Sequence, residues 1–215
     1  NSTQVIGATL GGLTIADAAV QAGLDFTQLK AMASGTYHTG LNNQVFNSIW
    51  PFYQFFLRIA TPVMLMARQG KKCSAPMITA FVICILLAGL DAGYHVATIP
   101  TMTLKDGKKR LFNSSVAAAP KLTKEFAWQQ GACITARNLA RLWRGILETN
   151  GWRKGIKGFA GAHGDTKTVV GIAFLSMIES LMGTFGVRFP QQLFVKKMTK
   201  AGARHQQITE LVQKN

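Results

Sequence analysis

The residues best suited to chemistry are three arginines within one predicted helix, residues 136–148. Arg137, Arg141 and Arg144 are spaced i, i+4 and i+7, so they share one helix face. A solvated helix face usually mixes charges of both signs, because opposite charges at i, i+4 stabilise it. Glu148 is the one acid close to this row in the sequence. We therefore expect the arginine face to bind an anionic partner outside the chain, with the stripe opposite it in the core. That stripe consists of Leu139, Leu142, Trp143 and Ile146.

The charge of the whole chain also favours an anionic partner. The net charge is +15, with 24 Lys and Arg against nine Asp and Glu. Residues 1–57 contain one base and two acids, and all the other charges follow them. Nucleic acid, anionic lipid and acidic protein tails are the usual partners of such chains. Arginine suits phosphate because its planar guanidinium can donate hydrogen bonds to two oxygens at once. A second basic cluster includes Arg68, Lys71 and Lys72.

Other kinds of chemistry have little support in the sequence. The three cysteines, Cys73, Cys84 and Cys133, form no CxxC pair, and the four histidines show no metal-ligand spacing. The carboxylates are scattered along the chain, with no phosphate-binding or nucleophile motif. We therefore predict no enzyme activity, metal, cofactor or small-molecule substrate. The cysteine pattern and the absence of a visible secretory signal predict a reducing compartment.

Three long apolar segments raise the question of a membrane. Residues 75–90 are followed by Asp91, residues 168–187 contain Glu179, and residues 45–67 contain Arg58. A spanning helix needs about 20 mostly apolar residues, and a central charge costs roughly 2.5–3.5 kcal/mol on insertion scales. Each segment is short or charged, so buried core helices are the favoured interpretation. A small polytopic membrane protein, a subunit of a larger complex, remains the alternative.

Periodicity and turn residues predict an all-α fold with a single helical core at 14–187. A flexible N-terminal arm at 1–13 precedes this core, and a basic C-terminal helix or arm follows at 188–215. Residues 91–120 are predicted as a loop or hairpin, because they are rich in turn formers and β-branched residues. The helices are expected at about 15–23, 26–33, 45–68, 77–90, 121–130 (capped by Thr123), 136–148, 165–182 and 191–213.

Residues 122–205 carry an ordered set of short motifs: RLWRGILETNGW, then GFAGAHGDTK, an apolar helix, and GVRFP before a basic helix. This set resembles the C-terminal half of coat proteins of flexuous filamentous plant viruses, the potexvirus type above all. The family places an acid among aromatics shortly after the second motif, whereas this chain has none before Glu179, so the family's buried Arg–Asp pair is not carried over. The matching positions are Trp143, Leu147, Asn150, Asp165, Thr166, Lys167, Arg188 and Pro190.

The resemblance implies an all-α core with extended arms that polymerises as a helical homo-oligomer around single-stranded RNA. The first hypothesis is therefore a viral coat protein or nucleoprotein, located in the virion and the host cytoplasm, that holds RNA in a basic groove without sequence preference. The membrane protein is the second hypothesis, and a ribosome-associated protein is a weaker third. The predicted RNA contacts are Arg137, Arg141, Arg144, Lys167, Arg188, Arg68, Lys71 and Lys72.

Overall fold

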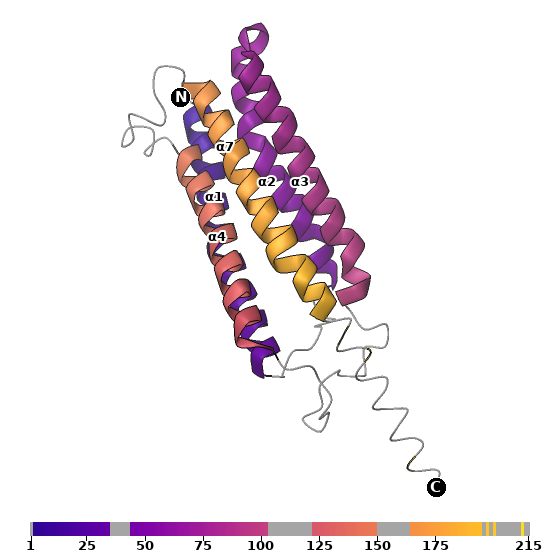
Figure 1. Ribbon diagram of the computed structural model, residues 1–215. Helices are drawn as coiled ribbons and strands as arrows, with labels where there is room; N and C mark the ends of the chain where they lie inside the picture. Colours follow the sequence, from indigo (N-terminus) through magenta and orange to yellow (C-terminus); the bar gives the residue numbers. More distant parts are fainter. Residues whose placement is uncertain are drawn as a thin grey trace.

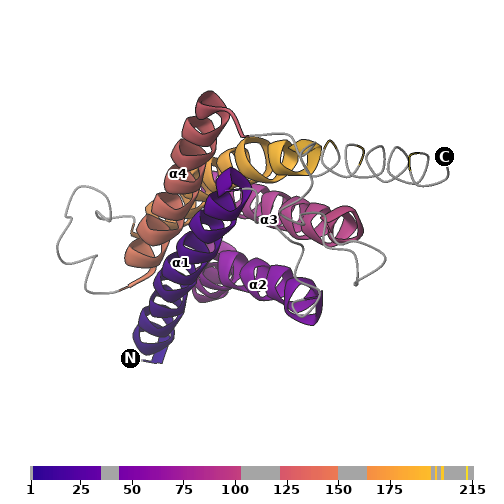
Figure 2. The same ribbon diagram turned by 90° about the horizontal axis from the view of Figure 1, so that it is seen from below.

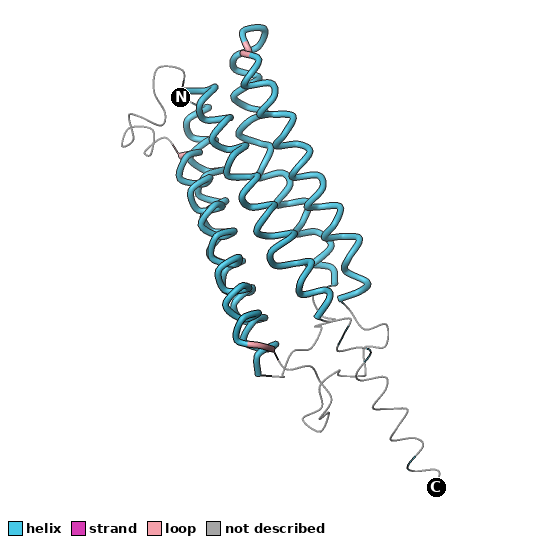
Figure 3. The backbone as a smooth tube through the Cα atoms, in the orientation of Figure 1, coloured by secondary structure: helices cyan, strands magenta, loops and turns pink. Residues whose placement is uncertain are grey.

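The computed structural model describes residues 2–34, 44–102, 122–149 and 164–194, with 197, 200 and 212. Across these ranges the chain is helical apart from a few residues between or at the ends of helices, and it contains no strand, so the predicted all-α class is confirmed (Figure 3). The elements are α1 (Ser2–Ser34), α2 (Gln44–Gln69), the 3₁₀ turn η2 (Gly70–Lys72), α3 (Ala75–Met102), α4 (Lys124–Glu148), α7 (Gly164–Ser180) and the π-helix η3 (Leu181–Arg188). Helical backbone continues from η3 to Phe194.

The long helices pack side by side, and each runs opposite to the helix before it (Figure 1). Helix α4 packs against α1 on one side and α7 on the other, while α3 packs against α7 and α2. Contacts between α1 and α2 close the arrangement, which Figure 2 shows from below. The bundle therefore has an interior that all five long helices line.

Helices α1 and α4 approach each other closely because glycines lie at their crossing. A Cβ atom on Gly11 would lie 2.5 Å from the Gly145 carbonyl oxygen, and one on Gly145 would lie 2.8 Å from the Gly11 carbonyl oxygen. Gly7, one turn before Gly11, also faces α4, at the carbonyl of Glu148. Gly7 and Gly11 form a GxxxG motif, a spacing that lets helix backbones come into direct contact.

The N-terminal part of the chain differs from the prediction. Residues 2–13, predicted as a flexible arm, form the first part of α1, because Gly7 and Gly11 pack on α4. The two short helices predicted at 15–23 and 26–33 are also parts of α1, so Gly23 does not end a helix. Among the described residues the one glycine with positive φ is Gly70, at 55°, in the turn between α2 and α3.

The observed bounds of α3 and α4 also differ from the predicted ones. Helix α3 continues to Met102, so the loop or hairpin predicted from residue 91 begins in helix, and its part at 103–120 lies outside the described residues. Helix α4 covers both helices predicted at 121–130 and 136–148. Its predicted cap is confirmed, since the Thr123 hydroxyl accepts a hydrogen bond from the Phe126 N–H at 3.2 Å.

The predicted C-terminal helix or arm at 188–215 is helical as far as Phe194. Beyond Phe194, most of its residues lie outside the described part of the chain.

Candidate functional site: a buried arginine–carboxylate cluster

The orientation of α4 is the reverse of the predicted one. Arg141 and Arg144 are 2% and 1% exposed, and Arg137 is also buried. Leu139 and Trp143, predicted to lie in the core, are each 47% exposed. The arginine row therefore faces the interior of the bundle, and the apolar stripe faces outward.

Glu179 of α7 is the main partner of this row. Its Oε1 accepts a hydrogen bond from Arg141 Nε at 2.8 Å, and its Oε2 accepts one from Arg144 Nη1. Arg58 of α2 reaches the same carboxylate, with Nε 3.8 Å from Oε2. The prediction that the arginine row lacks a partner within the chain is therefore wrong. Glu179 does not stand out as a partner in the sequence, because it lies 35 or more positions from the arginines that it binds.

Arg58 also connects the cluster to α3. Its Nη1 pairs with Asp91, and its Nη2 donates to the Ser176 carbonyl and the Ser180 hydroxyl, each at 2.7 Å. The Ser180 and Thr184 hydroxyls in turn donate to the two oxygens of Asp91, both at 2.7 Å. Because several donors surround it, Asp91 is held as a hydrogen-bonded partner for Arg58.

Glu148 and two acids of α1 extend the cluster. Glu148 is buried, 3.8 Å from Arg144 Nε and 3.1 Å from the Thr14 hydroxyl. Asp25 lies 4.0 Å from Arg137 Nη1 and accepts hydrogen bonds from Gln21 and Asn138. Asp17 is buried and accepts hydrogen bonds from Gln54 of α2, at 3.3 and 3.4 Å.

Uncharged polar residues fill the interior near η3. Gln130 of α4 donates to the Gly186 carbonyl at 2.7 Å and accepts from Gln191 at 3.1 Å. The Tyr94 hydroxyl of α3 donates to Gln192 at 2.6 Å. Side-chain hydrogen bonds therefore link helices across the centre of the bundle, where globular proteins usually place apolar groups.

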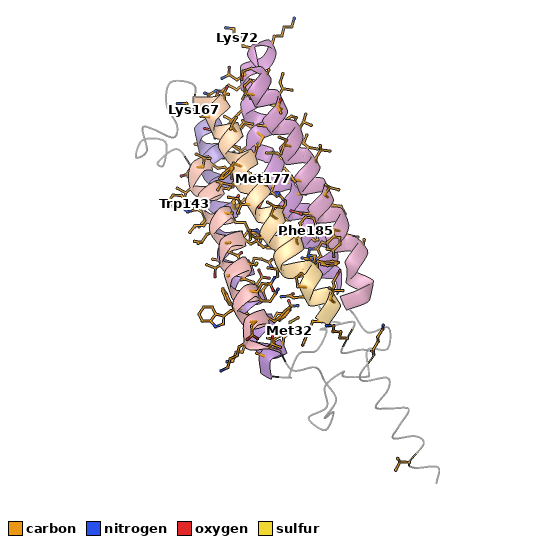
Figure 4. All side chains as sticks on the ribbon, viewed as in Figure 1. Met32, Lys72, Trp143, Lys167, Met177 and Phe185 are labelled. Atoms are coloured by element: carbon orange, nitrogen blue, oxygen red, sulfur yellow. The ribbon has the colours of Figure 1, made fainter. Side chains whose placement is uncertain are left out.

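The other predicted RNA contacts lie at one end of the bundle or beside the cluster. Lys71 and Lys72 are exposed in η2, and Lys167 is exposed at the start of α7; Figure 4 shows Lys72 and Lys167 at the same end. Arg68 is exposed and pairs with Asp165 at 2.8 Å. Arg188 is partly buried, and its Nη2 lies 3.0 Å from His95 Nδ1. The structure therefore separates the predicted set into an exposed group at the end and an internal group.

The outward faces of the helices are uncharged over most of their length. On α1, no charged residue from Val5 to Leu29 is exposed, and Lys30 follows at the helix end. On α4, the exposed residues after Glu125 are Trp128, Gln129, Ala132, Thr135, Leu139 and Trp143. On α7 and its helical continuation to Phe194, the exposed residues after Lys167 are Val170, Phe174, Met177, Leu181, Phe185, Phe189 and Leu193. Figure 4 shows Trp143, Met177 and Phe185 along the bundle, away from its basic end.

The same pattern holds on α2 and α3. From Ile49, where the described side chains of α2 begin, the exposed residues before Arg68 are Ile49, Phe52, Phe56, Val63 and Ala67. No residue of α3 from Ala75 to Ala97 is both charged and exposed. Charges therefore lie inside the bundle or at the helix ends, and apolar side chains cover its sides. This arrangement is the inverse of that in a water-soluble globular protein, in which charged residues cover the surface.

Sequence reasoning missed the acidic half of the cluster. In the predicted core helices, Glu179 and Asp91 count only as interruptions of apolar segments, although a charge inside a long apolar helix is itself a signal of a partner. Each of the three segments that raised the membrane question contains or meets one member of the cluster: Arg58, Asp91 or Glu179. Within the described part of the chain, no group of three His, Cys, Asp or Glu residues could hold a metal ion.

Among the described residues, three helical segments are long and apolar enough, by length and composition, to cross a membrane: Val5–Lys30, Ala75–Ala97 and Asp165–Phe194. Comparison of the chain with protein-family models, curated protein sequences and solved structures found no match.

Proposed function

We propose that this chain is a polytopic membrane protein whose functional centre is the buried arginine–carboxylate cluster. The observation that carries this proposal is the inverted distribution of charge. Arg141, Arg144 and Glu179 lie inside, while the outward side chains between the helix ends are apolar or uncharged. In a bilayer this distribution is favourable, because hydrocarbon covers the apolar sides and the charges face one another.

The dimensions of the bundle suit a bilayer. The apolar part of α3, Ala75–Ala97, has 23 residues. At 1.5 Å per residue its length is about 34 Å, close to the roughly 30 Å of a hydrocarbon core. The turn η2 and the start of α7 lie at one end of the bundle, and the end of α1 and the start of α4 lie at the other (Figure 1). The first end carries the exposed Lys71, Lys72 and Lys167, and the second carries the exposed Lys30 and Lys124. Lysines at both ends of apolar helices fit the polar interfaces of a membrane.

The packing of the helices also favours a membrane. Lipid tails are as apolar as leucine, so membrane helices associate through close backbone contact at small residues and through interhelical polar contacts. The crossing of α1 and α4 at Gly7, Gly11 and Gly145 is a close backbone contact of this kind. The hydrogen bonds to Glu179 are polar contacts between helices. Prolines within helices are better tolerated in membranes too, and α2 contains Pro51 and Pro62.

A buried cluster of this size has a functional implication. Charged residues inside membrane helices are costly, and where they occur they mark ion or substrate pathways, proton relays or binding sites. Here five helices contribute ionisable residues to one interior, including Asp17, Arg58, Asp91, Arg141 and Glu179. We therefore assign the cluster, rather than an outer surface, as the centre of activity.

Alkaline carbonate extraction tests the proposal. The full chain expressed in cells is expected to stay in the membrane pellet after carbonate treatment, because an integral bundle is held by its apolar sides. A peripheral protein held by its net charge of +15 would instead be released. Recovery of the chain in the carbonate supernatant would overturn the proposal.

The RNA-binding coat protein remains a prediction. Its leading observation was the arginine row, and a phosphate could reach Arg141 and Arg144 only if the bundle opened around them. The exposed basic residues Lys71, Lys72 and Lys167 are still available for such a role. Filaments in negative-stain images and strongly salt-dependent RNA binding would support the coat-protein hypothesis.

A further inference from the structure

A small cavity lies beside the ion cluster. Its volume is about 30 Å³, and one water molecule needs roughly 10–15 Å³ of such space. The space therefore suits two or three waters, or one monatomic ion with a water. The charged and imidazole side chains in its wall are Arg58, Asp91, His95, Arg137, Arg141, Glu179 and Arg188.

The positive charges in this wall are unevenly paired. Glu179 and Asp91 contact Arg58 and Arg141. Among the described residues, by contrast, no carboxylate forms an ion pair with the Arg188 guanidinium, which contacts His95. Arg137 reaches Asp25 only at 4.0 Å. The wall formed by Arg137 and Arg188 is therefore cationic and short of acceptors.

One donor in this wall is buried without an acceptor. Arg137 is 7% exposed, and its Nε has no hydrogen-bond partner. A buried guanidinium N–H left unpaired is destabilising, so an acceptor supplied from outside the chain would stabilise the folded state. Because Arg137 lines the cavity, such an acceptor has a place to bind.

The backbone beside this wall is unusual in the same place. The π-helix η3 carries Gly183, Thr184 and Arg188, all of which line the cavity. A Cβ atom on Gly183 would lie 2.8 Å from Arg137 Nε, so the glycine leaves room for the guanidinium. Single π-helical turns within α-helices are frequent at functional sites.

We propose that the cavity walled by Arg137, Arg188 and His95 binds one small inorganic anion of halide size. The inference rests on the charged interior of the proposed membrane protein and gives it a ligand. The anion would accept from Arg137 and Arg188 and would balance the cationic side of the wall.

The test uses the full chain purified in detergent, with chloride, bromide and gluconate as sodium salts at equal ionic strength. The thermal midpoint is expected to be about 3 °C or more higher in chloride and bromide than in gluconate, because bound anion stabilises the folded state. A second measurement is the line width of the chloride NMR signal, which is expected to increase when the protein is added. Equal midpoints in the three salts, without line broadening, mean that the cavity holds water and overturn the inference.

Variants assign the effect to the cavity. Arg188→Gln and Arg137→Gln are expected to lose the chloride-dependent shift and the line broadening. Gly183→Ala provides a second route if an arginine variant fails to fold, because the added methyl displaces the Arg137 side chain. Lys167→Gln is the matched control, since it removes an exposed cation away from the cavity and should keep the full effect. A chloride effect that persists in the cavity variants contradicts the assignment. Carbonate extraction tests the membrane separately, so either proposal can fail without the other.

Discussion

Replacement of Glu179 by glutamine is expected to lower the free energy of unfolding by about 3–5 kcal/mol, the usual cost of removing one partner of a buried ion pair. The expected loss is large because one carboxylate serves three arginines. Arg141 and Arg144 donate to it directly, and Arg58 lies 3.8 Å away. The amide of glutamine keeps the size of the side chain and removes its charge, so the guanidinium groups stay buried without compensation.

Unfolding of the variant in mixed detergent and denaturant, followed by tryptophan fluorescence, measures this loss. Glu125→Gln is the matched control, because Glu125 is exposed in the first turn of α4. The control is expected to lose no more than about 1 kcal/mol, from the weaker interaction with the helix dipole. Equal losses in the two variants would show that the cluster does not hold the bundle together.

The double variant Glu179→Gln with Arg144→Gln refines this result. Arg144 is 1% exposed, and its second acid, Glu148, lies 3.8 Å away. Replacing Arg144 removes one of the buried positive charges that Glu179→Gln leaves without a carboxylate. The double variant is therefore expected to lose less free energy of unfolding than the sum of the losses of the two single variants. Strict additivity would indicate that Arg144 and Glu179 do not interact.

A methyl group on Gly11 is expected to produce the second large effect. In Gly11→Ala the new Cβ would lie 2.5 Å from the Gly145 carbonyl oxygen and 2.6 Å from Thr149 Cγ2. Backbone atoms cannot rotate away as a flexible side chain can, so α1 and α4 must move apart. The expected cost is about 1–3 kcal/mol, the usual range for overpacking.

Gly12→Ala is the matched control for Gly11→Ala. The two glycines are neighbours in α1, but a Cβ on Gly12 would meet nothing within 4 Å. Alanine is a better helix former, so the control is expected to be neutral or to gain up to about 1 kcal/mol. Denaturant unfolding of both variants measures the difference. Equal stability of the two variants would contradict the close crossing of α1 and α4.

Local sequence signals predicted the secondary structure better than the orientation of the helices. The period of α4 and its cap at Thr123 follow from residues within one helix, and the structure has both. Which face of α4 points inward depends on Glu179, a residue of another helix. The prediction placed the arginines on an outer face that binds an anionic partner, and under that assumption Trp143 had to lie in the core.

The helix boundaries at glycines failed for a related reason. Gly7, Gly11 and Gly23 read as flexible or terminating residues when α1 is considered alone. In the bundle, Gly7 and Gly11 are the points where α4 comes close, so tertiary packing outweighs their low helix propensity. The GxxxG spacing within an apolar segment was the available signal for this contact.

Thiol labelling of two exposed positions tests the central claim, that lipid covers the sides of the bundle. In a chain whose native Cys73, Cys84 and Cys133 are replaced by serine, cysteine is introduced at Phe174 or at Lys72, both of which are exposed. A charged maleimide is then added to both sides of opened membranes. Lys72→Cys is expected to react, whereas Phe174→Cys is expected to react only after denaturation, because hydrocarbon excludes both the reagent and the thiolate. Equal labelling of the two positions in the native protein would contradict the account.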